Sequence, residues 1–126
     1  MFSHIMLGAD DLDAAKRFYD ATIGALGGEE GRFDPKGRVV YMHNGGVFLV
    51  SKPINGEPAS CANGSTIGFA ADSPEMVDAW HRAGVENGGT AIENPPGLRD
   101  VNSGKAYLAY LRDPAGNKLC AMKRLG

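Results

Sequence analysis

Two stretches of the chain begin with a short apolar run and continue with apolar residues at helical spacing. In the first, residues 2–8 form a candidate strand, and the helix after it carries one apolar stripe, made of Leu12, Ala15, Phe18, Tyr19 and Ile23. In the second, a strand begins at Thr66 and is followed by a helix with the stripe Met76, Val77, Trp80 and Ala83. Aspartate at 10 or 11 and serine at 73 are suitable N-caps. The pattern predicts two strand–helix units, with helices near 11–24 and 74–84.

The two units repeat each other, with Thr66 of the second at the position of His4 in the first. Residues 4–19 and 66–81 align without a gap, and the alignment pairs Ile5 with Ile67, Asp10 with Asp72 and Phe18 with Trp80. A repeat of half the chain length, present only twice, excludes a solenoid. It predicts one domain built from two similar halves, with any pocket shared between them.

Each strand–helix unit is followed by signals for three short strands. These lie near 28–34, 37–43 and 46–52 in the first half, and near 89–95, 105–112 and 117–123 in the second. Asn44-Gly45 between apolar runs is a strong hairpin signal, because both turn residues tolerate positive φ. Asp113-Pro114-Ala115-Gly116-Asn117 supplies a longer turn in the second half. We therefore expect βαβββ twice, with Tyr41 and Tyr110 at matching positions.

The domain prediction is a single α+β domain over residues 1–126. Module one covers about 1–52, a linker rich in proline and glycine covers about 53–64, and module two covers about 65–126. A chain of 126 residues is long enough to bury a substantial core.

Composition narrows the classes of partner and location. A net charge of −2 with interspersed signs predicts no nucleic-acid partner and no membrane partner. No apolar run approaches the roughly 20 residues of a membrane-spanning helix, and the first residues lack the pattern of a signal peptide. Two cysteines, Cys61 and Cys120, form no disulfide framework. We expect a cytoplasmic protein with reduced thiols.

Taken together, these motifs resemble the vicinal oxygen chelate superfamily, which includes glyoxalase I, extradiol dioxygenases and the bleomycin-resistance proteins. The resemblance is carried by His4, by the D-x-x-x-A-x-x-F-Y helix from Asp11 to Tyr19, by Gly24, and by the D-P-x-G-N turn at 113–117. It covers essentially the whole chain. It implies two tandem βαβββ modules that form a curved mixed sheet around a cup-shaped cavity, with the helices outside.

The resemblance also implies a divalent metal held by histidine and carboxylate ligands from both modules. Carried over by position, His4 stands at the first-strand ligand, Thr66 at its repeat partner, Cys120 at the last-strand carboxylate and Leu49 near the fourth-strand ligand. Only His4 keeps the family's residue type. We therefore expect no cofactor; if a divalent metal does bind, His4 and Cys120 are its candidate ligands.

Strand alternation, started from those ligand positions, predicts which side chains face the cup, and repeat symmetry adds Tyr41 to them. The expected substrate-binding residues are Met6, Tyr41, Leu49, Thr66, Leu108, Tyr110, Lys118 and Cys120. A mostly apolar surface with a few polar groups is typical of a small-molecule site; the alternative is that these residues fill the cup as ordinary core. A long polar loop at 94–105 is predicted as a lid whose Arg99 reaches an anionic substrate group. Phe18, Phe48, Phe69 and Trp80 should pack between the helices and the sheet.

Three functions fit this sequence. The first is a glyoxalase-like lyase that acts on a small carbonyl compound through a degenerate metal site. The second is a metal-free protein that binds and sequesters a small molecule, as in antibiotic resistance. The third is metal-free acid–base catalysis by His4 and Tyr110. The resemblance also implies a homodimer, and the length of the linker leaves open whether the modules are exchanged between chains.

Overall fold

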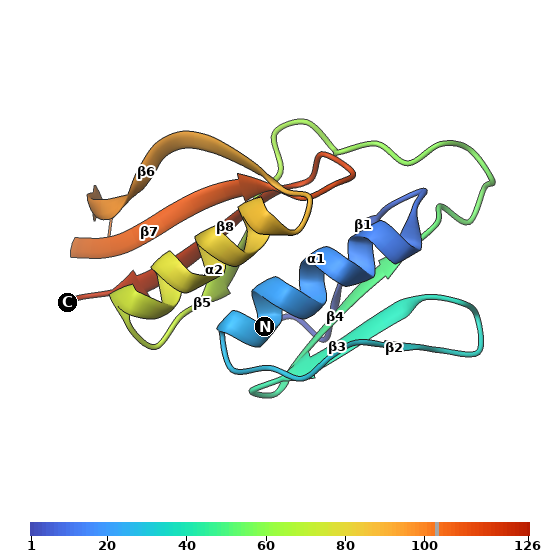
Figure 1. The fold of residues 1–126 in the computed structure, drawn as a ribbon, viewed down its shortest axis with the longest axis horizontal. Helices are drawn as coiled ribbons and strands as arrows, with labels where there is room; N and C mark the ends of the chain where they lie inside the picture. Colours follow the sequence, from blue (N-terminus) through green and yellow to red (C-terminus); the bar gives the residue numbers. More distant parts are fainter. Residues whose placement is uncertain (103) are drawn as a thin grey trace.

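Two βαβββ modules follow one another in the computed structural model, which describes residues 1–102 and 104–126 (Figure 1). The first contains β1 (Ile5–Gly8), α1 (Leu12–Ala25), β2 (Arg32–Phe33), β3 (Val39–His43) and β4 (Gly46–Ser51). The second contains β5 (Ile67–Ala70), α2 (Pro74–Glu86), β6 (Thr90–Val101), β7 (Gly104–Arg112) and β8 (Lys118–Arg124). The prediction of an α+β fold with two tandem modules is confirmed.

Each module forms its own four-stranded mixed sheet. The strand orders are β1-β4-β3-β2 and β5-β8-β7-β6, in which only the first pair of each sheet is parallel. The sheets do not close into a barrel, and across residues 1–102 and 104–126 no strand pairing joins β1 to β5. Figure 1 shows α1 and α2 next to each other on the same side of both sheets.

The helices begin where the sequence predicts. The Asp11 carboxylate accepts a hydrogen bond from the backbone N–H of Ala14 at 3.0 Å, and the Ser73 hydroxyl accepts one from Met76 at 3.2 Å. Within α2, a Cβ added to Gly84 would clash with Leu111 of β7 and would lie 3.2 Å from the Phe18 ring of α1, so this glycine lets α2 pack closely on both. Neither helix is long and apolar enough to span a membrane in the part of the chain that the structure describes.

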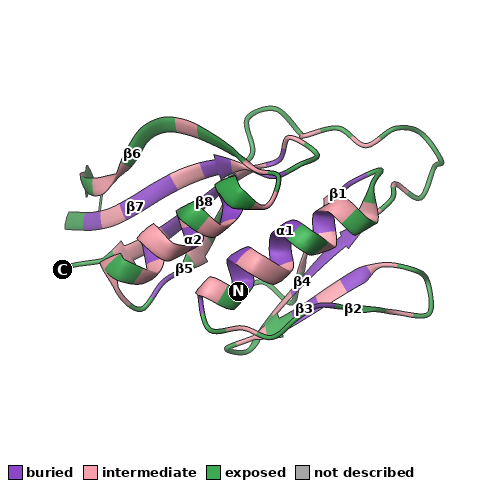
Figure 2. Cartoon of the chain, viewed as in Figure 1, coloured by how far each residue is buried: buried purple, intermediate pink, exposed green. Residues whose placement is uncertain are grey.

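A single apolar core lies between the helices and the sheets and joins the two modules. Phe18 and Trp80, which occupy equivalent repeat positions, are both fully buried in it. Phe48 of the first sheet packs edge-on against Phe69 of the second, with ring centroids 5.5 Å apart. In Figure 2 the buried residues gather along β4, β7, β8 and the helices, whereas the linker is mostly exposed. The prediction that these four aromatic residues form core is confirmed.

Strand register shows which residues of the two modules are equivalent. Met6 is paired with Leu49 in the first sheet, and Gly68 with Cys120 in the second. Because Met6 and Gly68 stand at the same position of the sequence repeat, Leu49 and Cys120 are equivalent, as predicted. The predicted match of Tyr41 with Tyr110 is wrong, because Tyr41 pairs with Phe48 and its equivalent on β7 is Leu111, which pairs with Leu119.

The predicted lid loop is largely a strand. Ile92 pairs with Tyr110 and residues 97–101 pair with 104–108, so β6 continues through most of the segment that the sequence assigned to a loop. The register shifts between Ile92 and Gly97. Pro95 and Pro96 cannot donate to a strand ladder and lie within this bulge, which explains why a turn-rich sequence still pairs on both sides of it.

Candidate functional site: the outer sheet faces

Each sheet has one face that packs on the helices and a second face that points away from them. We call the second face the outer face; it is the face that the sequence predicted to line the cup. Alternate residues of β1, β4, β5, β7 and β8 belong to the main core, so the residues between them lie on the outer faces. The predicted site residues on these faces are Met6 and Leu49 of the first sheet, and Thr66, Leu108, Tyr110, Lys118 and Cys120 of the second. This is the face that strand alternation predicted for them, and their contact with a substrate stays a prediction.

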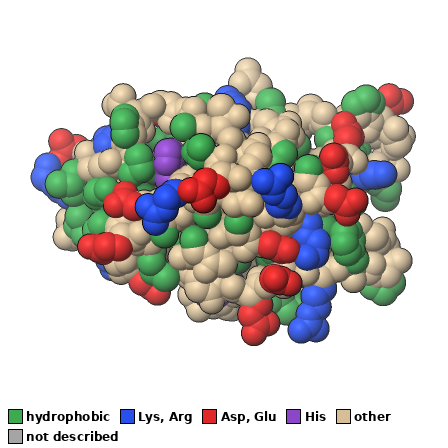
Figure 3. Space-filling model, in the orientation of Figure 1, with side chains coloured by type: hydrophobic (Ala, Val, Ile, Leu, Met, Phe, Trp, Pro, Cys, Tyr) green, Lys and Arg blue, Asp and Glu red, His purple; other side chains and the backbone are tan. Residues whose placement is uncertain are grey.

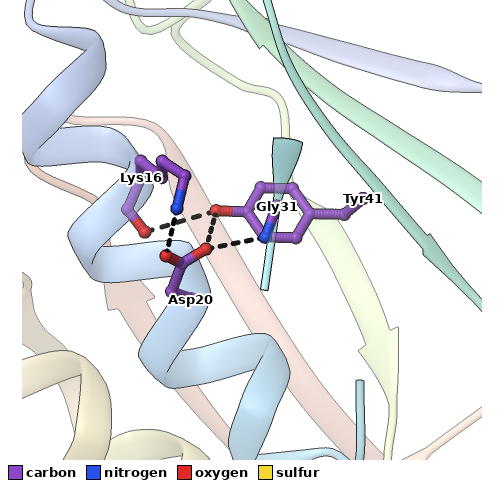
Figure 4. A network of polar contacts seen from close by, with 4 residues as sticks. All are labelled: Lys16, Asp20, Gly31 and Tyr41. Carbon is purple, nitrogen blue, oxygen red and sulfur yellow. Dashed lines mark hydrogen bonds and ion pairs between the residues drawn. The ribbon is translucent and has the colours of Figure 1, made fainter. Parts of the chain in front are cut away.

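Tyr41 is the exception, because it faces α1. Its hydroxyl donates to the Asp20 carboxylate at 2.8 Å and to the backbone carbonyl of Lys16 at 3.3 Å (Figure 4). Asp20 also accepts from the backbone N–H of Gly31 at 2.9 Å and pairs with the Lys16 ammonium at 2.7 Å. Burial alone would raise the pKa of Asp20, but these hydrogen bonds lower it below its usual value. Tyr41 therefore does not lie on the outer face where the sequence placed it, but connects β3 to α1. Its contact with a substrate stays a prediction.

The proposed acid–base pair of His4 and Tyr110 comes from two different modules, and its catalytic role stays a prediction. His4 is exposed just before β1, with its Nδ1 2.8 Å from the Ser3 hydroxyl, whereas Tyr110 lies partly buried on β7 of the other sheet. No hydrogen bond connects them among the described residues. Burial raises the pKa of Tyr110, which leaves the phenol a weaker acid than usual.

The outer face of the second sheet carries a small apolar cluster of its own, separate from the main core. It consists of Ala106, Leu108 and Cys120, with Val101, Tyr110 and Met122 packed against them. Cys120 is only 4% exposed. Burial raises its pKa to about 11, with a further contribution from Glu93, so its sulfur is a protonated thiol at neutral pH. We call these six residues the outer-face cluster.

Charged groups border the outer-face cluster. The Lys118 ammonium lies 4.8 Å from the centre of the Tyr110 ring and forms an ion pair with Glu93. Glu93 has a φ of 59°, a conformation that side-chain-bearing residues seldom adopt, within the bulge of β6. Arg112, opposite Lys118 on the neighbouring strand, was missed by sequence reasoning. The signal was available, since Arg112 continues the alternation of Leu108 and Tyr110.

Arg99, the predicted substrate-anchoring residue, folds back on its own strand. Its guanidinium donates to the carbonyl oxygens of Pro95 at 2.7 Å and Leu98 at 3.1 Å. The side chain therefore stabilises the bulge of β6 in this structure. Its contact with a substrate stays a prediction.

The residues at the family's ligand positions do not fit a histidine and carboxylate metal site. Leu49 cannot coordinate and is 7% exposed, and metal binding to Cys120 requires loss of a proton whose pKa is about 11. Among residues 1–102 and 104–126, no group of three His, Cys, Asp or Glu side chains lies close enough to hold a metal ion. Of the four ligand positions, His4 alone keeps a suitable side chain.

Cavities lie near the site and between the modules. One of about 270 Å³ opens between the two modules and is lined by apolar side chains such as Ile5, Phe48 and Phe69, with His43 at its wall. One of about 160 Å³ lies beneath the linker, beside Thr66 and Lys118. On the face seen in Figure 3, acidic and basic side chains are mixed, without a large patch of one sign.

Comparison with known proteins places this geometry among related folds. Residues 1–121 match the family described as the Glyoxalase/Bleomycin resistance protein/Dioxygenase superfamily. A crystal structure of a glyoxalase/bleomycin resistance protein from Albidiferax ferrireducens T118 is 56% identical, with a TM-score of 0.95 over 98% of this chain and 99% of that one. A lactoylglutathione lyase from Agrobacterium tumefaciens is 27% identical, with a TM-score of 0.66 over 97% and 92% of the two chains. A search of curated proteins found no match.

Proposed function

Because the chain belongs to the Glyoxalase/Bleomycin resistance protein/Dioxygenase superfamily, yet lacks its metal-ligand set, we propose that it binds a small molecule without a metal. The observation that carries this proposal is the pair of equivalent positions Leu49 and Cys120. One holds a buried hydrocarbon, which cannot coordinate a metal, and the other a buried thiol whose pKa is about 11 in place of the carboxylate that the family resemblance implies.

The outer-face cluster supplies the recognition surface in this proposal. Leu108 and Met122 offer apolar contacts, and Tyr110 adds an aromatic ring with a polar end. Lys118 and Glu93 border this surface with charge. Apolar walls with a few placed polar groups suit a small organic ligand. Neither a nucleic acid nor a membrane is expected as a partner, given the mixed charges and the net charge of −2.

Metal loading tests the proposal directly. After incubation with excess Zn²⁺ or Ni²⁺ and removal of free metal, elemental analysis is expected to find well under one equivalent per chain. Thermal unfolding should be unshifted, because a metal that binds only the folded state raises stability. Retention of about one equivalent that is lost in His4→Ala, but kept in His43→Ala, would contradict the proposal.

A glyoxalase-like lyase with a degenerate metal site is the second candidate. His4 at one ligand position favours it, as does the 27% identity to the lactoylglutathione lyase. Its test is an assay of lactoylglutathione turnover with and without added divalent metal. Turnover above background that is abolished in His4→Ala would replace the binding function with this one.

We expect the protein to be a homodimer in the cytoplasm. Within the described residues, β1 and β5 each pair on one side only, and Met6 on the outer face of the first sheet is 42% exposed. Both features leave surface that a second copy would cover. Light scattering at micromolar concentration should give twice the 13.3 kDa mass of the chain. A mass equal to that of one chain would rule the dimer out.

A further inference from the structure

A small polar pocket lies beneath the linker at the end of the second sheet, beside the outer-face cluster. Its volume is about 160 Å³, and its lining includes Asn63, Ser65, Thr66, Arg112 and Lys118. Two of these side chains are cations, two are hydroxyls and one is an amide, and the described residues that line the pocket include no carboxylate. Such a set of hydrogen-bond donors suits an oxyanion.

The two cations of the pocket oppose each other directly. Arg112 and Lys118 are register partners on the antiparallel strands β7 and β8, an arrangement in which like charges repel. Glu93 offsets the charge of Lys118. The Arg112 guanidinium donates to the backbone carbonyl of Gly116 at 2.7 Å, which carries no compensating charge. Two positive groups and one negative group therefore leave one positive charge at the pocket.

We propose that this pocket binds the carboxylate or phosphate group of an organic anion whose apolar part lies on the outer-face cluster. The inference rests on the proposed binding function and names the class of its ligand. A guanidinium binds two oxygens of such a group at once, and an ammonium adds a point charge. The hydroxyls of Ser65 and Thr66 provide further donors at the linker side of the pocket.

The position of the pocket sets the distance between the two parts of the ligand. Thr66 lines the pocket beside Lys118, and Lys118 lies on the same outer face as Cys120, two positions before it on β8. Two residues along a strand span about 6.6 Å. A compact acid with a ring or short hydrocarbon body therefore reaches from Arg112 to the outer-face cluster.

Substitutions of Glu93 and of Arg112 are expected to change the affinity for anions in opposite directions. Glu93 pairs with Lys118 from β6 without lining the pocket. Glu93→Gln raises the net charge beside the pocket by one unit, so anion affinity should rise about threefold. Arg112→Gln removes the cation whose contact is a neutral carbonyl, so affinity should fall about tenfold. If only the net charge of the protein mattered, replacing any arginine with glutamine would lower the anion affinity by the same factor.

Titration followed by NMR tests the inference with three probes at low ionic strength, where charge effects are largest. The probes are inorganic phosphate, benzoate and uncharged benzamide. Phosphate should shift the amide signals of Ser65, Thr66 and Lys118 in the wild type. Arg112→Gln should weaken the binding of phosphate and of benzoate but not the binding of benzamide. Arg82→Gln, an exposed charge change on α2, is the matched control and should stay within twofold of the wild type. Ser65→Ala, at an exposed position just after the linker and before β5, gives a second variant that leaves the sheet intact and should weaken phosphate binding several-fold.

The outcomes separate this inference from the function on which it rests. If benzamide shifts signals of Leu108 and Met122 while phosphate binds no more weakly to Arg112→Gln and Ser65→Ala than to the wild type, the anion pocket is refuted and the binding function stands. In the opposite case, phosphate binds the pocket, benzoate binds no more tightly than phosphate, and benzamide shifts no signal in the outer-face cluster. The pocket then stands and the proposed apolar site fails. Absence of any phosphate shift at tens of millimolar refutes the pocket.

Discussion

Replacing Asp113 with alanine is expected to lower the free energy of unfolding by about 3–5 kcal/mol, because it removes a buried carboxylate with four hydrogen-bond donors around it. Asp113 is 3% exposed. One carboxylate oxygen accepts from the Tyr19 hydroxyl at 2.5 Å and the Asn117 side chain at 2.9 Å. The other accepts from the backbone N–H groups of Ala115 at 3.0 Å and Asn117 at 2.8 Å. Alanine leaves these donors without acceptors.

The same contacts connect the two modules. Tyr19 lies on α1, whereas Asp113 and Asn117 lie in the turn between β7 and β8. The Asn117 amide also donates to the backbone carbonyl of Gly8, at the end of β1, at 3.0 Å. Loss of Asp113 therefore weakens both the turn and the junction of the modules, which is why its expected effect exceeds that of a single hydrogen bond.

Urea unfolding of a small set of variants measures this effect. Asp113→Asn keeps the shape but places an amide N–H₂ among donors, and Tyr19→Phe removes one bond at a cost of about 1–3 kcal/mol. A double-mutant cycle of these two changes should show strong coupling. Asp100→Ala, at an exposed aspartate, is the control and should change stability by less than about 0.5 kcal/mol. A loss below about 1 kcal/mol in Asp113→Ala would show that the network is not what joins the modules.

The Tyr19 phenol adds a pH dependence to the same network. Burial, and then the charge of Asp113, raise its pKa well above 10.0. A raised pKa in the folded state means that stability is complete below the unfolded value near 10 and falls as the pH rises above it. Part of this alkaline loss should disappear in Tyr19→Phe, in which no phenol can ionise.

The sequence repeat predicted the order of strands and helices in the molecule and part of the candidate site. The ungapped match of residues 4–19 with residues 66–81 located both helices. Strand alternation placed Leu49, Leu108 and Cys120 on the outer faces. These predictions depend on local periodicity, which side-chain burial enforces at each position. Local pattern was therefore sufficient where one face of a strand or helix had to be buried.

The errors arose where the two modules differ in length. Leu49 and Cys120 are farther apart in the sequence than His4 and Thr66, so the offset of the ungapped repeat no longer holds after the helices. Matching Tyr41 to Tyr110 misses the true equivalent, Leu111, by one position, and in a strand this reverses the face. The contact of Tyr19 with Asp113 joins segments near opposite ends of the chain, and no local pattern reports on such a contact.

Alkylation of Cys120 at pH 8 is expected to be at least about 20-fold slower in the folded protein than in the same chain unfolded in urea. With a pKa of about 11, only about one thiol in a thousand is ionised at this pH, against about a quarter for an ordinary thiol. A more basic thiolate is intrinsically more reactive, which reduces the difference in alkylation rate by about tenfold. Burial at 4% exposure slows the reagent further.

Cys61→Ser isolates the reaction of Cys120, and Cys120→Ser reports that of the partly exposed Cys61 for comparison. The rate at Cys120 should rise about tenfold for each pH unit between 8 and 10, because the thiolate fraction does so below the pKa. Rapid alkylation at pH 7 would instead mean a thiolate beside Lys118. Such a thiolate could ligate a metal with His4 or act as a nucleophile, so this measurement separates metal-free binding from catalysis at the position where the superfamily's carboxylate ligand would stand.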